Sequence, residues 1–182
     1  MKRIVVVGNS GAGKSTLASE LAVHLRLPYI ASDGFYWEDG WTPAASAVVR
    51  RRIVESVAGD RWVIDGNCIA ERDVVWGKAD ALIWLDYTLP LVLWRVCERN
   101  FRWVATQERT WSGNRMTLGR ACSGIRHSLR TYTQKRTTYP RYLAEFPHLS
   151  VIHFRAPQEA KLWLAYYVTG NNKWPPPHGG FV

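Results

Sequence analysis

The chain has 182 residues, of which 47% are hydrophobic and 21% charged, and its formal net charge is +9. This composition is typical of one globular domain and excludes a disordered chain. The first apolar run, Ile4–Val7, is too short for a signal peptide or a membrane span, so we expect a soluble, cytoplasmic protein with no membrane partner. The three cysteines form no CxxC pair, which favours ordinary thiols over a redox or zinc site.

Strand-like and helix-like stretches alternate along the chain. Residues 3–7 form an unbroken apolar run typical of a buried strand, and 14–27 carries Leu17, Leu21 and Leu25 at the spacing of one helix face. The further expected elements are an extended stretch at 29–32, helices at 43–57 and 89–104, strands at 61–65 and 81–86, a helix that resumes at about 122, a strand at 149–154 and a helix at 157–168.

This alternation predicts an α/β fold in which helices cover both faces of a parallel sheet. We expect one domain over 1–170 and a flexible tail at 171–182, which is rich in proline and glycine. Pro43 is expected at the first position of the second helix, after Thr42 as its cap. Pro140 is expected to kink or split the long helix near the end of the chain.

The stretch "GNSGAGKS" fits the pattern G-x-x-x-x-G-K-[ST] and lies between a predicted strand and a predicted helix. In such a loop the glycines let backbone N–H groups point inward, and the helix offers its positive end to phosphate. Lys14 should reach the β- and γ-phosphates of a nucleoside triphosphate. The alternative is a glycine-rich turn that only caps a helix. The residues predicted to bind ATP, adenine being the default base, are Gly8, Ser10, Gly11, Ala12, Gly13, Lys14, Ser15 and Thr16.

A magnesium site beside this loop requires a hydroxyl and a carboxylate at the end of a neighbouring strand. Ser15 supplies the hydroxyl. Asp65 in "WVIDGN" is the favoured carboxylate because Gly66 lets the chain turn tightly beside the metal. Asp86 in "IWLDY" is the alternative, and it could instead cap the helix that follows it. We therefore predict Mg²⁺ held by Ser15 and Asp65.

Residues 95–141 contain eleven basic side chains against two acidic ones, which accounts for the whole net charge. One interpretation is an anion site for a phosphoryl group in transfer. The other is a track for nucleic acid, since Trp103 and Trp111 lie among the arginines. In the first interpretation these tryptophans anchor the segment, and a further group of basic residues only covers solvated faces. That further group is Arg102, Arg109, Arg120 and Lys135.

The loop, "DGFYWEDGW", "WVIDGN", "ADALIWLD" and "WRVCER", in this order, resemble the adenylate-kinase-like P-loop kinases. The most similar group is the small bacterial proteins described as DNA topology modulation or adenylate-kinase-related proteins. The resemblance implies a three-layer α/β/α P-loop fold with a five-stranded parallel sheet and a helical lid inserted at about 95–141. It also implies that Asp65 serves the magnesium and that Arg95 and Arg99 contact the transferring phosphate. Their i, i+4 spacing puts both on one helix face.

Three further arginines of the same segment are candidates for the phosphoryl group: Arg115, Arg126 and Arg130. On the acceptor side, Asp33 follows the second short strand, where related small-molecule kinases hold the acceptor hydroxyl with a carboxylate. An Asx-type turn is the alternative interpretation of Asp33-Gly34. Arg72 could meet an anionic acceptor or remain a solvated charge. Three aromatic residues could either wall the acceptor or pack a helix: Tyr36, Trp37 and Trp41.

These features predict an enzyme that transfers the γ-phosphate of ATP, with Mg²⁺, to a hydroxyl or phosphate of a small-molecule acceptor. The arginine that holds AMP in true adenylate kinases is missing, because "SDGFYW" occupies its place. The alternatives are a nucleic-acid-linked P-loop ATPase, a nucleoside monophosphate kinase and a nonenzymatic nucleotide sensor. The sequence does not identify the acceptor or the oligomeric state.

Overall fold

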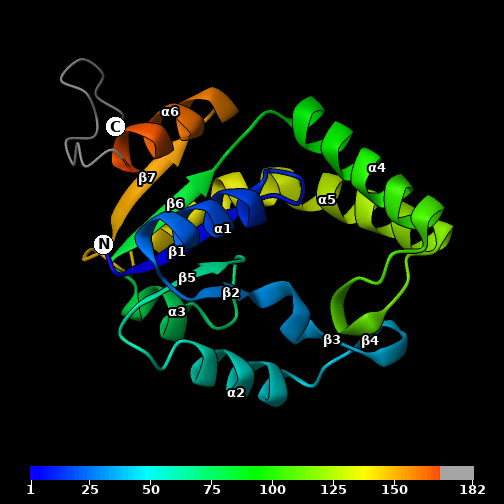
Figure 1. Ribbon diagram of the computed structural model, residues 1–182, viewed down its shortest axis with the longest axis horizontal. Coiled ribbons are helices and arrows are strands. Elements are labelled where there is room, and N and C mark those ends of the chain that lie inside the picture. The colour runs from blue at the N-terminus through cyan, green and yellow to red at the C-terminus, as the bar shows by residue number, and fades with distance from the viewer. Residues whose placement is uncertain (169–182) are drawn as a thin grey trace.

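A five-stranded parallel sheet forms the centre of the computed structural model, which describes residues 1–168 (Figure 1). The tail expected at 171–182 lies outside the described residues. The strand order is β2-β5-β1-β6-β7, and every neighbouring pair is parallel, as predicted. The strands are β1 (Arg3–Gly8), β2 (Tyr29–Ala31), β5 (Trp62–Asp65), β6 (Ala81–Leu85) and β7 (Ser150–Phe154).

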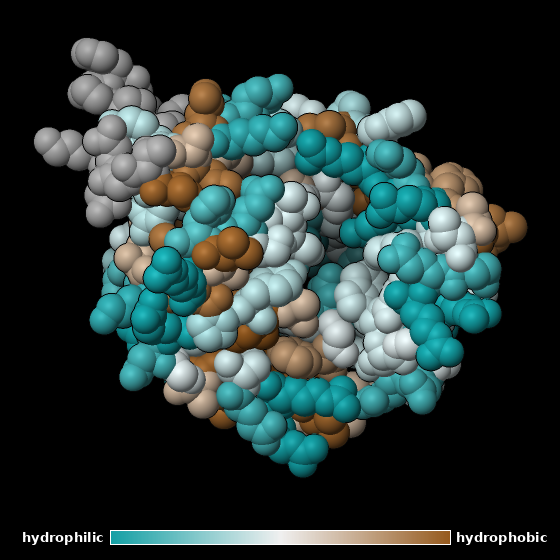
Figure 2. All heavy atoms as spheres, viewed as in Figure 1, coloured by the Kyte–Doolittle hydropathy of each residue, from teal (hydrophilic) through white to brown (hydrophobic). Residues whose placement is uncertain are grey.

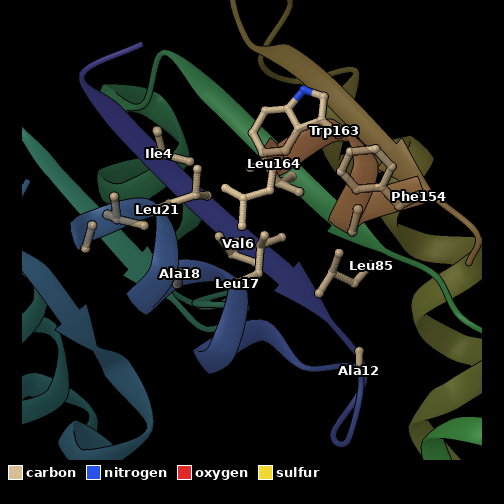
Figure 3. Packing of buried hydrophobic residues seen from close by; sticks show 14 of the residues in the cluster. Ile4, Val6, Ala12, Leu17, Ala18, Leu21, Leu85, Phe154, Trp163 and Leu164 are labelled. Carbon is tan, nitrogen blue, oxygen red and sulfur yellow. The ribbon is translucent and has the colours of Figure 1, made fainter. Parts of the chain in front are cut away.

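Helices α1 (Lys14–Leu25) and α6 (Pro157–Val168) pack on one face of the sheet (Figure 3). Ile4 and Val6 of β1 point to this face, where they join buried side chains from both helices. Since successive residues of a strand point to opposite faces, the unbroken apolar run of β1 requires a second covered face. The helical residues of this core include Leu17, Ala18, Leu21, Trp163 and Leu164.

Helices α2 (Ser46–Ser56), α3 (Arg72–Lys78) and the C-terminal half of α5 (Leu118–Leu143) cover the other face. Val5 and Val7 of β1 point to this side. Residues that lie far apart in the chain complete this core, among them Ile53, Trp76 and Tyr139, all at most 1% exposed. The predicted three-layer α/β/α arrangement is therefore confirmed.

Helix α4 (Leu89–Thr106) pairs with the N-terminal half of α5, and both extend beyond the sheet (Figure 1). The α4–α5 loop, residues 107–117, contains the short 3₁₀ turn η3 (Trp111–Gly113). Beside it lies the hairpin of β3 (Trp37–Glu38) and β4 (Thr42–Pro43), which follows η1 (Ser32–Tyr36) and encloses η2 (Asp39–Trp41). None of the helices within 1–168 is both long and apolar enough to cross a bilayer.

The start of α2 differs from the prediction. Pro43 lies in β4, where it pairs with Trp37, and the helix begins three residues later at Ser46 with Ala45 at its N-cap. The expectation that Thr42 caps this helix is therefore wrong. The sequence did not suggest the hairpin, because its strands have two residues each and because distant residues of the α4–α5 loop, Ser112 and Asn114, hydrogen-bond to it.

Helix α5 begins at Leu118, earlier than predicted, and of the two effects expected of Pro140, a kink or a split, the structure excludes the split. The Thr117 hydroxyl accepts a hydrogen bond from the Arg120 N–H at 3.4 Å and caps the helix. Gly124 does not end the helix, since it lies where α4 and α5 pack closely and a Cβ there would come within 3.1 Å of the Asn100 amide. Pro140 falls in the last turn, where the loss of one N–H donor is tolerated because few residues follow.

Candidate functional site

The glycine-rich loop, Gly8–Ser15, joins the carboxyl end of β1 to the first turn of α1. Gly11 has a φ of 79°, and a Cβ at this position would collide with the Val92 carbonyl of α4. Only glycine fits this backbone conformation and this close approach. The loop therefore curls around the N-terminus of α1, whose free N–H groups and dipole favour an anion.

Lys14 begins α1 and turns back over the loop, where its Nζ donates to the Asn9 carbonyl at 3.2 Å. Burial lowers the pKa of Lys14, while the nearby Asp33 and Asp65 carboxylates act in the opposite direction. The neighbouring Arg99 guanidinium lowers this pKa further. Two cations thus converge on the loop, an arrangement that a bound polyphosphate would stabilise.

Asp65 ends β5 beside the loop and is 4% exposed. Burial raises the pKa of its carboxyl, an effect opposed by the Ser15 hydroxyl and the Lys14 charge. Its Oδ1 has no hydrogen-bond partner within residues 1–168. A buried carboxylate oxygen with no donor, next to a serine hydroxyl, fits a hard cation. The same environment raises the pKa of the Tyr29 phenol to about 12, chiefly through burial and then through the Asp65 charge.

No group of three or more His, Cys, Asp or Glu side chains is placed to hold a metal within the described chain. A site of one hydroxyl and one carboxylate agrees with magnesium, which keeps several water or phosphate ligands. Gly66, with a φ of 130°, makes the tight turn after Asp65, and a Cβ there would collide with the Ser32 hydroxyl. The residues present therefore fit magnesium at Ser15 and Asp65.

Asp86, the alternative carboxylate, points away from this site. It forms an ion pair with Arg136 at 2.8 Å and contacts His153 Nε2 at 3.2 Å. It does not cap α4 either, since Thr88 occupies the N-cap of that helix. The pair with Arg136 instead ties α5 to the end of β6.

Arg95 and Arg99 lie on the face of α4 that is turned toward the loop. The Arg99 Nη2 donates to the Ser10 hydroxyl at 3.0 Å, and its guanidinium stacks on the Trp103 ring at 4.8 Å. Burial lowers the pKa of Arg99. Arg95 approaches the loop at Gly13, where its Nη1 would lie 3.6 Å from an added Cβ. The structure thus brings both predicted arginines next to the predicted phosphate site.

Two cavities meet at the glycine-rich loop, and Figure 2 shows the molecule hollowed near its centre. The first cavity has a volume of about 590 Å³ and lies over the loop, the N-terminal turns of α1 and one side of α6. The second has a volume of about 420 Å³ and lies between η1, the β3–β4 hairpin, α4 and α5. The residues that line both are Ser10, Lys14, Asp33, Arg99, Trp103 and Trp111.

Four tryptophans wall the second cavity. The Trp41 ring packs edge-to-face against Trp37 at 5.4 Å and against Trp111 at 6.0 Å, and Trp111 packs in the same way against Trp103 at 5.6 Å. Trp37 and Trp41 therefore line the second cavity. Tyr36 does not line either cavity of the described chain, since its hydroxyl donates to Glu71 at 2.9 Å.

The β3–β4 hairpin and the α4–α5 loop are joined by hydrogen bonds around Asn114, which is 6% exposed. Its Oδ1 accepts from the Trp41 N–H at 2.9 Å, and its Nδ2 donates to the Glu38 carbonyl at 2.9 Å. The Ser112 hydroxyl donates to the Trp37 carbonyl at 2.6 Å. We call these contacts the clasp, and they join the two segments that carry Trp37, Trp41 and Trp111.

Several predicted residues lie outside both cavities. Arg72 pairs with Glu145 at 2.9 Å and stacks on Tyr142, so it does not face the site. Three arginines that we expected near the phosphoryl group are exposed, and none of them lines the two cavities of residues 1–168. These are Arg115, Arg126 and Arg130.

Lys135 is the main residue that sequence reasoning missed, since we expected it on a solvated face. It is half-buried and lines the second cavity, where its Nζ donates to Asn9 Oδ1 at 3.3 Å. Arg120 also lines this cavity. Asn67 supports the loop from β5, because its Oδ1 accepts from the Gly8 N–H at 3.0 Å. The only signal for Asn67 was its place in "WVIDGN", and no sequence signal separated Lys135 from the other basic residues of α5.

The chain was compared with known proteins by sequence and by structure, and each comparison found a similar protein. No family model matches the chain. It is similar to the uncharacterized protein YqaC of Bacillus subtilis (strain 168), with 27% identity over 103 residues, and the match covers 56% of this chain and 58% of that protein. It is also similar to the crystal structure of a gluconokinase from Sinorhizobium meliloti 1021. The TM-score is 0.51 with 18% identity, over 93% of this chain and 94% of that one. The chain therefore has a P-loop α/β fold, and its finer resemblance to adenylate-kinase-related proteins stays a prediction.

Proposed function

We propose that this protein is a phosphotransferase that moves the γ-phosphate of ATP, in the presence of Mg²⁺, to a hydroxyl group of a small molecule. The observation that carries the proposal is the junction of the two cavities. Lys14, Arg99 and Asp33 line both cavities, so two cations and one carboxylate face the point where the contents of the two would touch. Such a junction suits the transfer of a group from one ligand to another.

The donor side is assigned to the first cavity. The loop N–H groups and the Lys14 ammonium would hold the β- and γ-phosphates, and Arg95 and Arg99 would contact the phosphoryl group. Ser15 and Asp65 would hold the magnesium, which neutralises charge on these phosphates when it is bound. Burial of these groups strengthens each contact, because the surrounding dielectric is lower than that of water.

The acceptor side is assigned to the second cavity, with Asp33 at its inner end. The acceptor oxygen would form a bond to the γ-phosphorus, the bond from that phosphorus to the β–γ bridging oxygen would break, and ADP would leave with the electron pair. The hydroxyl proton would pass to the Asp33 carboxylate. Because the transition state of such a transfer is loose, the main role of Asp33 is to orient the hydroxyl.

A screen of alcohols, sugars, nucleosides and their phosphates for stimulated ADP release tests the proposal. We expect one chemical class to raise ADP release well above the basal rate. The variant Lys14→Ala should lower this stimulated turnover by about 10²–10³ because it removes a cation from the transition state. Circular dichroism should report an intact fold. Stimulated turnover that persists in Lys14→Ala would contradict the assignment.

A nucleic-acid-linked ATPase is the second candidate, supported by the exposed arginines of α5, Arg126 and Arg130. Binding to a labelled oligonucleotide over a range of salt concentrations separates the two. Tight binding that falls steeply with salt and improves with ATP supports this candidate. ATP consumption that requires an added metabolite supports the kinase.

A further inference from the structure

The second cavity has a cationic lining that phosphoryl transfer alone does not explain. Lys14 and Arg99 are assigned to the donor phosphates in the proposed function, on which this inference rests. Two more cations, Arg120 and Lys135, line this cavity and not the first. The single acidic side chain that lines it within the described chain is Asp33. An acceptor in this cavity therefore meets an excess of positive charge.

The contacts of Lys135 favour an anionic ligand in this cavity. Its ammonium forms no ion pair within residues 1–168, and its hydrogen-bond acceptor is the neutral amide of Asn9. The charged groups that face it are Lys14 on α1, Asp33 on η1 and Arg99 on α4. Burial and the Lys14 charge lower the pKa of Lys135 to about 7, with Asp33 acting in the opposite direction. A buried cation without a counter-ion is unfavourable unless a ligand supplies one.

The tryptophan walls do not suit an acceptor that is itself a cation. The Arg99 guanidinium covers the Trp103 ring at 4.8 Å, and the Arg120 guanidinium approaches the Trp41 ring at 5.9 Å. A quaternary ammonium group would have to compete with these arginines for the ring faces. The tryptophan edges and remaining faces can still pack against the apolar or ring-shaped body of a ligand.

We propose that the acceptor carries an anionic group of its own, a carboxylate or a phosphate monoester, in addition to the hydroxyl that receives the phosphoryl group. The anionic group lies against Lys135, and the body of the molecule packs between the tryptophans. The hydroxyl then faces Asp33 at the junction of the two cavities. This makes Lys135 a specificity-determining residue.

The test uses acceptors in matched sets: hydroxy acids, sugar or nucleoside monophosphates, their neutral counterparts, and alcohols with a quaternary ammonium group. We expect kcat/KM for the anionic members to exceed that of the neutral ones by about tenfold or more, since charge-assisted hydrogen bonds are lost without the anion. The hydroxy acids and the phosphates show which anion fits. Equal or better turnover of neutral or cationic members overturns the inference.

Three variants locate the effect. Lys135→Met should remove most of the preference for anionic acceptors while the affinity for magnesium and ATP is retained, and Lys135→Arg should restore the preference. Arg141→Met removes an exposed charge from the same helix and should change neither quantity. If Lys135→Met weakens ATP binding as much as acceptor binding, the lysine serves the donor and the inference fails.

The pH dependence of acceptor affinity distinguishes a lysine that binds the acceptor from one with only a structural role. The affinity for a hydroxy acid should fall as the pH rises above about 7, where the Lys135 ammonium loses its proton. In Lys135→Arg the charge persists, so the affinity should change much less. Calorimetry compares the affinities of the anionic and neutral compounds, and this comparison tests the inference even if no compound is phosphorylated. Absence of turnover with all compounds would instead contradict the proposed function.

Discussion

At the scale of single residues, the site depends on two lysines that reach it from different elements. Lys14 comes from the first turn of α1, and Lys135 from the middle of α5. Burial lowers the pKa of Lys135 in the folded chain to about 7, below the ordinary lysine value of 10.5, so the unfolded chain binds the proton more tightly. Burial of Lys135 therefore destabilises the fold most below pH 7, and this penalty shrinks as the pH rises toward 10.5.

Asp33 gives the most direct test at this scale. It lines both cavities, and none of the described residues forms an ion pair with it. Asp33→Asn should leave the affinity for magnesium and ATP nearly unchanged, because the carboxylate is assigned to the acceptor. Transfer should fall by about 10² or more, since the amide orients a hydroxyl less well and takes no proton.

Isothermal titration calorimetry and steady-state kinetics check this expectation. Asp39→Asn is the matched control, because Asp39 is an exposed carboxylate in the neighbouring 3₁₀ turn. A large loss of ATP affinity in Asp33→Asn would instead assign the carboxylate to the donor side or to the metal.

At the scale of secondary-structure elements, α5 connects the glycine-rich loop to the rest of the molecule. The buried Asn9 side chain donates to the Ser128 carbonyl at 3.1 Å and accepts from Lys135. The residue that follows Lys135, Arg136, forms an ion pair with Asp86, just after the end of β6. The helix therefore holds the loop from one side while its C-terminal half packs on the sheet.

The clasp joins two further elements that are distant in sequence, the β3–β4 hairpin and the α4–α5 loop. Asn114→Ala should remove its hydrogen bonds to Trp41 and Glu38 and leave two half-buried backbone groups without these partners. We expect a loss of about 1–3 kcal/mol in the free energy of unfolding. The KM for the acceptor should rise and tryptophan emission should shift to the red, because Trp41 and Trp111 gain exposure to water.

Ser112→Ala is the graded control for the clasp. It removes one hydrogen bond from an exposed side chain and should have a smaller effect on all three measurements. Unchanged emission and kinetics in Asn114→Ala would mean that tryptophan packing alone holds the hairpin against the loop.

At the scale of the whole molecule, the two cavities lie at the carboxyl ends of the strands. The chain leaves β1 at the centre of the sheet for α1 on one face, while β5 and β6 flank β1 on either side. Ligand sites of open parallel sheets occur where neighbouring strands lead away in opposite directions. The α4–α5 pair covers this edge of the sheet, so the site is built from both halves of the chain.

Binding at such a central site should stabilise the whole fold. A magnesium–ATP concentration of about 100 times Kd should raise Tm by roughly 5–10 °C, given about 2.7 kcal/mol of linkage energy and a domain of this size. Differential scanning fluorimetry measures the shift. Lys14→Ala should reduce it strongly, and omission of magnesium should reduce it in part. An unchanged Tm with every triphosphate would contradict the assignment of the loop.

The local sequence predicted the parts of the protein whose signals are local. The apolar run of β1, the spacing of leucines in α1 and the glycines between them specify a strand, a helix and a curled glycine-rich turn from neighbouring residues alone. The aspartate that ends β5 and the arginines at i, i+4 on α4 followed from the same short-range rules. The structure confirms the elements and places these side chains together.

Only the tertiary structure decided which distant residues share the site. The helical pattern of α5 does not say which of its basic side chains turns inward, because that depends on how the helix packs against α4 and against Asn9. The β3–β4 hairpin and Asn114 depend in the same way on contacts between segments more than seventy residues apart. The partial burial of Lys135 and the exposure of Arg126 and Arg130 therefore depend on the packing, since basic residues of one helix occur in both environments.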